Sequence, residues 1–165
     1  MRATMLRRVR ASAQKGMARS AFEDAYGDIL KAGGIDIDAN IKEANEMSLS
    51  DWIKAVATRG KWDYKNSKAL IAADFSPARL DEFGNVHFGV VAAAHGFSLS
   101  ATLFGAGSYQ VFRQSGGSLW DWGNAPFLAS DSEARFYTHM GWTWGDNPGD
   151  SVNIMKGWDY YDSNY

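Results

Sequence analysis

The sequence predicts a mainly α-helical fold, a single compact domain with irregular aromatic-rich loops, with an α+β fold as the alternative. The chain has 165 residues, of which 45% are hydrophobic and 22% charged, as in one soluble domain of ordinary size. Apolar residues recur at helical spacing and follow recognisable helix caps. No repeat and no low-complexity linker divides the chain.

Cap and stop signals place helices along the first half of the chain. Apolar residues from Phe22 to Leu30 have a spacing of three or four, and Gly33-Gly34 ends their helix. Ser48 with Asp51 resembles a capping box, and Gly60 stops the helix that follows. The predicted helices are 2–15, 19–32, one entered through the turn at 35–38, one from Ser48 to about Thr58, and a short one over 67–73.

The second half is read in the same way. Ser76-Pro77 is a good N-cap and first-turn pair. Residues 85–95 are rich in small residues and valine and predict a buried helix, although periodicity alone leaves a strand open. The remaining predictions are a helix from Ser98 with Leu99, Leu103, Tyr109 and Phe112 as anchors, a loop at 115–118, an irregular segment 119–128, a helix from Ser130 to about Met140, a tight aromatic turn at 141–145, and a final helix capped by Asn147-Pro148 through about Lys156.

Charge is unevenly distributed along the chain. The net charge is −2, yet the first twenty residues carry six basic residues and no acid, so the rest carries 11 basic and 19 acidic residues, a balance of −8. Residues 1–19 are thus a basic arm or first helix, and residues 20–165 form the main domain. The acidic body argues against a broad nucleic-acid-binding face.

Several classes of site and protein are excluded by what the sequence lacks. It has no cysteine, which rules out disulfides, thiolate zinc sites and cysteine nucleophiles. The longest apolar stretch, Phe88 to Ala94, is far shorter than the roughly 20 residues that span a bilayer. The N-terminus has no apolar block of a secretory signal, so export would need another carrier.

Two short stretches framed by glycines combine charged, aromatic and amide side chains. A core does not need this mixture, because buried charges cost free energy unless they are paired. The functional interpretation is that two lysines neutralise a phosphate or a developing oxyanion while Asp63 orients one of them; a surface salt bridge is the alternative. His87 is a candidate base, or a structural histidine. The residues are Lys61, Trp62, Asp63 and Lys65 in the first stretch, and Asn85 and His87 in the second.

A second group of candidates lies near the C-terminus. Asp146 and Asp150 flank Asn147-Pro148-Gly149 and either cap a helix, bind a divalent cation or divide acid and base roles. Trp142 and Trp144 belong either to a ring-rich core or to the wall of a cleft for sugars or bases. No zinc-protease, EF-hand, P-loop or nucleophile-elbow motif is present.

The chain resembles the bacterial polymorphic toxin type 44 domain in five pieces from Ile35 to Gly157. These are 36–44, 60–65, 83–89 continuing to Gly96, Gly105-Ala106-Gly107 with Gln110, and 145–150 followed by Ile154 and Gly157. The resemblance implies a toxin module at the C-terminus of a larger delivery or secretion protein, paired with an immunity protein and described as a ribonuclease. The matched positions are Lys61, Trp62, Asp63, Lys65, Asn85, His87, Asp146 and Asp150; family members often carry Asn where this chain has His87.

Three hypotheses for function follow. The first is an antibacterial ribonuclease toxin acting in the target cytoplasm. The second is a cell-wall (peptidoglycan) hydrolase toxin with a lysozyme-like helical fold, acting in the periplasm, and the third is a non-catalytic carbohydrate-binding module. The predicted catalytic residues are Asp63, His87, Asp146 and Asp150; the predicted substrate-binding residues are Lys61, Trp62, Lys65, Asn85, Trp142 and Trp144. No metal or cofactor is required, with a divalent metal at Asp146 and Asp150 as the alternative.

Overall fold

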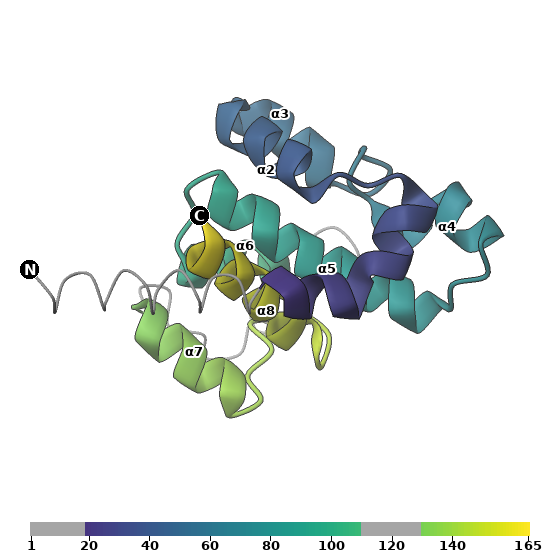
Figure 1. Cartoon of the computed structure of the whole chain (residues 1–165). Coiled ribbons are helices and arrows are strands. Elements are labelled where there is room, and N and C mark those ends of the chain that lie inside the picture. The colour runs from purple at the N-terminus through teal and green to yellow at the C-terminus, as the bar shows by residue number, and fades with distance from the viewer. Residues whose placement is uncertain (1–18, 110–129) are drawn as a thin grey trace, which may run out of the picture.

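The computed structural model describes residues 19–109 and 130–165 (Figure 1). Within these ranges every regular element is a helix and no strand is present, which confirms the mainly α prediction. The predicted helix at 2–15, the loop at 115–118 and the segment 119–128 lie outside the described residues. The elements are a helix over residues 19–33, α2 (Ile37–Glu46), α3 (Leu49–Val56), the 3₁₀ turn η1 (Tyr64–Asn66), α4 (Lys68–Ala72), α5 (Pro77–Ala94), α6 (Leu99–Tyr109), α7 (Asp131–His139) and α8 (Asp150–Asn164).

Serine caps start three of these helices as the sequence predicts. The side-chain oxygens of Ser48, Ser76 and Ser130 each accept a hydrogen bond from the backbone N–H three residues later. Ser130 completes a capping box with Glu133, whose carboxylate accepts from the Ser130 N–H. Such caps satisfy N–H groups that have no partner within the helix, so they fix these helix starts locally.

Helices α5 and α8 cross at the centre of the molecule (Figure 1). Glycines on both helices allow a close approach: a Cβ at Gly89 would lie 2.0 Å from the Ile154 carbonyl oxygen, and one at Gly157 would lie 1.8 Å from that of Val86. Both distances are far below an atomic contact, so only glycine fits at either position. The two helices therefore touch backbone to backbone.

Two hydrophobic clusters pack around this pair. The first joins the helix over 19–33 to α2, α3 and α5, with Phe22, Trp52 and Phe83 among its buried residues. The second joins α6, α7 and α8 around Leu103 and Trp144. Phe88 of α5 packs against both clusters, so the described helices form one domain. None of them is long and apolar enough to cross a membrane.

The structure confirms one prediction about the second half and corrects another. Residues 85–94 lie in the long, largely buried helix α5 with His95 as its C-cap, so the predicted helix is confirmed and the strand alternative is excluded. The final helix begins at Asp150 after Gly149, not at the Asn147-Pro148 pair, and it continues to Asn164 instead of ending near Lys156. Gly157, which locally favours a helix end, lies inside α8 because the helix crossing requires it there.

Candidate functional site

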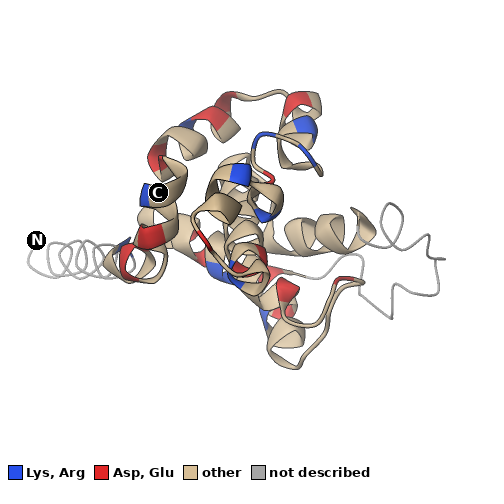
Figure 2. Cartoon of the chain, turned by 90° about the vertical axis from the view of Figure 1, so that its right-hand side faces the viewer, with Lys and Arg blue, Asp and Glu red and all other residues tan. Residues whose placement is uncertain are grey.

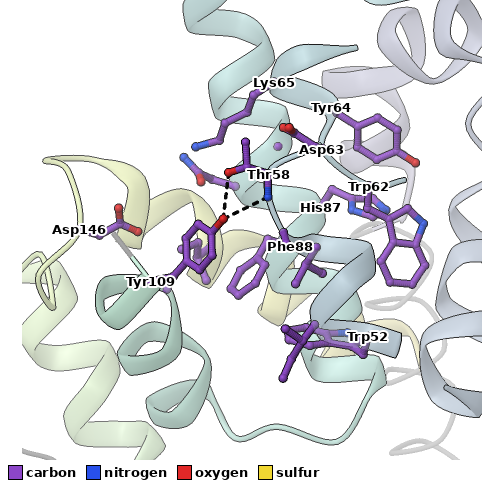
Figure 3. Close-up of a pocket in the computed structure, with 17 residues that line it drawn as sticks. Trp52, Thr58, Trp62, Asp63, Tyr64, Lys65, His87, Phe88, Tyr109 and Asp146 are labelled. Atoms are coloured by element: carbon purple, nitrogen blue, oxygen red, sulfur yellow. Dashed lines mark hydrogen bonds between the residues drawn. The ribbon is translucent and has the colours of Figure 1, made fainter. Parts of the chain in front are cut away.

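A pocket of about 210 Å³ opens where α3 and the loop that follows it face α5, α6 and the start of α8 (Figure 3). Lys65 and Asp146 lie at one side of this pocket, and Trp52 lies at the opposite side. Tyr109 closes one flank, because the Thr58 N–H donates to its hydroxyl at 3.2 Å. The rings that line the pocket belong to Trp52, Trp62, Tyr64, His87, Phe88 and Tyr109.

Lys65 supplies a positive charge at the side of the pocket where Asp146 lies, which we call the polar side. Its Nζ lies 2.6 Å from Asp81 Oδ1, and the two residues come from η1 and α5. The lysine chain lies directly over Gly84, where a Cβ would come within 2.8 Å of Lys65 Cγ. Gly84 therefore gives Lys65 room to cross α5 and reach Asp81.

Asp146 and Asp150 form a pair of carboxyls at the start of α8. Asp150 is buried, with 5% of its surface exposed, and Asp146 accepts a hydrogen bond from the Asn147 N–H at 2.9 Å. Burial raises the pKa of Asp146 to about 6, and the neighbouring Asp150 adds to this rise. Burial also raises the pKa of Asp150, with Lys65 opposing and Asp81 reinforcing the rise. The pair therefore retains a proton at a higher pH than ordinary aspartates do.

Asn85 lines the same pocket and has a donor without a partner within the described part of the chain. It lies one turn after Asp81 on α5 and is only 6% exposed. Its Nδ2 is buried and has no hydrogen-bond partner among the described residues. A buried amide without a partner costs free energy, so this group is poised to donate to an oxygen of a bound molecule.

His87 lines the pocket but is almost fully buried, at 1% exposure. Its Nε2 lies 3.0 Å from Asn40 Nδ2, an amide nitrogen that only donates, so we assign the proton of the neutral ring to Nδ1. Rings of Tyr64 and Trp62 meet it edge-on, at centroid distances of 4.7 and 5.6 Å. Burial, with a smaller effect of Lys61, lowers the pKa of His87 to about 3. These contacts favour a structural role for His87 over that of a base.

The side chains of the loop that carries the two predicted lysines lie in two different surroundings. The Asp63 carboxylate accepts from the Arg59 N–H at 2.7 Å and from Asn66 Nδ2 at 2.8 Å. It therefore orients its own loop, and the prediction that it orients a lysine is wrong. Lys61 pairs with Glu43 and lies 4.4 Å above the Trp62 ring, outside the pocket. Of the two lysines, only Lys65 faces the carboxyls.

The two C-terminal tryptophans do not line the pocket. Trp144 is buried in the cluster of α6, α7 and α8, where its Nε1 donates to Thr138 Oγ1 at 3.1 Å. Trp142 packs on Tyr137 with ring centroids 4.7 Å apart. They therefore contribute nothing to this pocket, which Trp52, Phe88 and Tyr109 line instead, and their role in substrate binding stays a prediction.

Sequence reasoning missed Asp81, which joins Lys65 to the carboxyl pair. Its spacing of four from Asn85 on a helix was the available signal, since such residues share one face. A divalent metal at Asp146 and Asp150 stays a prediction; over residues 19–109 and 130–165, no three His, Asp or Glu residues are grouped to hold a metal ion.

Comparison with known proteins places the chain among bacterial toxins. The family model described as Bacterial toxin 44 matches residues 72–163, more than half of the chain. The matched segment contains Asp81, Asn85, Asp146 and Asp150, whereas Lys65 precedes it. Searches of curated proteins and of solved structures found no match. The chain therefore belongs to the Bacterial toxin 44 family.

Proposed function

We propose that this toxin domain is a ribonuclease that uses Asp146 and Asp150 as an acid–base pair. The observation that carries the proposal is the meeting of this proton-retaining pair with Lys65 and the unpartnered Asn85 amide at one side of a ring-lined pocket. Phosphodiester cleavage without a cofactor needs a base, an acid and stabilisation of the charge on phosphorus, and this group supplies all three.

The chemistry balances within the pair. The 2′-oxygen of a ribose attacks phosphorus, so the O2′–P bond forms and the P–O5′ bond breaks. The ionised carboxylate of the pair accepts the 2′-hydroxyl proton, and the protonated carboxyl gives its proton to the departing 5′-oxygen. The pair finishes with one proton, as it began. Lys65 and the Asn85 Nδ2–H stabilise the oxygens that become more negative during the attack.

The biological setting follows from the toxin family. We propose that the domain is delivered into a target bacterium by a larger secretion or delivery protein and cleaves RNA in the cytoplasm there. The producing cell needs a cognate immunity protein, because its own RNA carries the same bonds.

The test is cleavage of RNA by the purified chain in buffer containing a metal chelator. Wild-type protein should produce 5′-hydroxyl and 2′,3′-cyclic phosphate ends, and Asp146→Asn should cut at least about 100-fold more slowly. Asp162→Asn is the matched control, because Asp162 is exposed and lies outside the pocket lining. Rates within about twofold of wild type for both Asp146→Asn and Asp150→Asn would refute the assignment.

A cell-wall glycan hydrolase is the second candidate. The observation that favours it is a polar side with three carboxyls, of Asp81, Asp146 and Asp150, against one ammonium, beside aromatic walls of the kind that bind sugar rings. It ranks second because the same side of the pocket also carries the Lys65 ammonium and the unpartnered Asn85 amide, which suit an anionic phosphate better than a neutral glycan. Lysis only after export to the periplasm, with intact RNA, would establish it instead.

A further inference from the structure

A second hollow, of about 580 Å³, lies on the loop between α3 and α4 and adjoins the pocket. The two share Thr58, Asp63 and Tyr64 in their linings, so they lie on either side of the same short segment. We call this hollow the loop groove; it is lined by Thr58, Arg59, Gly60, Lys61, Asp63, Tyr64, Asn66, Ser67 and Lys68.

The loop groove is basic within an otherwise mixed surface. Figure 2 shows acidic and basic residues interspersed over the described helices, but the loop groove holds three cations and a single carboxylate. That carboxylate, of Asp63, accepts hydrogen bonds from its own loop. Arg59 and Lys68 form no ion pair with any carboxylate among the described residues, and both are exposed. Two cations are therefore available to an anionic ligand.

The backbone conformation of the loop fixes the position of Arg59, one of these two cations. Arg59 has a φ of 67°, a left-handed conformation that costs a residue with a side chain of order 1 kcal/mol. The bond from its N–H to Asp63 Oδ2, at 2.7 Å, holds the turn in this conformation. The arginine thus projects from an organised turn at the border of the pocket.

We propose that the loop groove binds a backbone phosphate of single-stranded nucleic acid whose neighbouring nucleotide enters the ring-lined pocket; this rests on the ribonuclease function proposed above. Exposed lysine and arginine supply the attraction that the acidic body lacks. Aromatic walls stack an unpaired base of any sequence. A paired base would have to leave its duplex to enter so small a pocket, so single strands are preferred.

The test measures binding apart from cleavage. Asp146→Asn protein, which is expected not to cut, is titrated with a fluorescent 12-nucleotide single-stranded RNA and with the matching duplex, at several salt concentrations. The double substitution Arg59→Gln with Lys68→Gln in this background should weaken single-strand binding about tenfold at 0.15 M salt. It should also reduce the slope of log affinity against log salt by about 1.4, since each contact to a single strand contributes about 0.7.

The control carries Lys31→Gln with Lys156→Gln, which remove the same charge and line neither hollow. Unchanged affinity and slope in the Arg59/Lys68 protein relative to this control would overturn the proposal, and so would equal affinity for the duplex. Single substitutions that each lower the slope by about 0.7 support it even if the double variant unfolds. The cleavage assay distinguishes the two proposals. If wild-type protein cleaves RNA but the salt slope is unchanged in the Arg59/Lys68 protein, only the loop-groove proposal is refuted. If the salt slope falls but wild-type protein cleaves no RNA, only the ribonuclease proposal is refuted.

Discussion

Substitution of Gly89 by alanine tests whether the crossing of α5 and α8 holds this fold together. The added Cβ would lie 2.0 Å from the carbonyl oxygen of Ile154 and 2.9 Å from the Trp158 nitrogen. A relaxed contact between carbon and oxygen needs about 3.5 Å, so the helices must separate by more than about 1 Å. Backbone atoms cannot rotate out of the way as a side-chain end does, so the adjustment falls on the packing of both helices.

The magnitude follows from two opposing effects. Alanine is favoured over glycine inside a helix by about 1 kcal/mol. Overpacking of a filled interior costs up to about 3 kcal/mol, and a clash with backbone belongs at the upper end. We expect Gly89→Ala to lower the free energy of unfolding by about 2 kcal/mol, which in a chain of this size lowers Tm by about 4–8 °C.

Urea unfolding followed by tryptophan fluorescence measures the change. Gly27→Ala is the matched control, because Gly27 lies inside the helix over 19–33 and no described atom is within 4 Å of its Cβ position. That substitution should raise the free energy of unfolding by up to about 1 kcal/mol. If Gly89→Ala proves as stable as Gly27→Ala, the backbone contact between α5 and α8 is refuted.

Three other substitutions test the site. Because the pKa of Asp146 is raised to about 6 in the folded state, its protonated carboxyl stabilises the fold below pH 4, and this stabilisation is lost as the pH rises through 6. In urea unfolding, the free energy of unfolding of Asp146→Asn should therefore exceed that of the parent by about 1–2 kcal/mol at pH 7.5 and equal it at pH 4. A difference that does not depend on pH would contradict this expectation. His87→Gln should lower the free energy of unfolding by about 1–3 kcal/mol, because the hydrogen bond with Asn40 is disturbed, and it should keep the pH dependence of RNA cleavage. A 100-fold slower cleavage rate with an unchanged free energy of unfolding would instead make His87 the base. Gly84→Ala should displace the Lys65 side chain and slow RNA cleavage about tenfold. The free energy of unfolding should change by less than about 1 kcal/mol, because the crowded atom belongs to a flexible side chain. An unchanged cleavage rate would show that Lys65 does not act from its position over Gly84.

The sequence by itself determined the starts of the serine-capped helices, because the signals that start them are local. Ser48, Ser76 and Ser130 cap their helices through contacts three residues away, and such contacts are readable from a short window. The candidate pairs Asp146/Asp150 and Asn85/His87 were also found from local patterns, and both line or border the pocket. The toxin family was accessible for the same reason, since the resemblance rests on short stretches of chain, of which those from residue 83 onward lie in the matched segment.

Only the tertiary structure decided which candidates meet. Lys65 reaches Asp81 while Lys61 turns to Glu43, although the two lysines are four residues apart. His87 is neutral because Asn40, 47 residues away, and surrounding rings bury it. Burial and hydrogen-bond partners depend on elements that are distant in sequence, and these set both the pKa and the direction of a side chain. A residue's type is therefore local information, but its chemistry in this toxin is fixed by the segments that pack against α5, namely α2, the loop after α3 and η1.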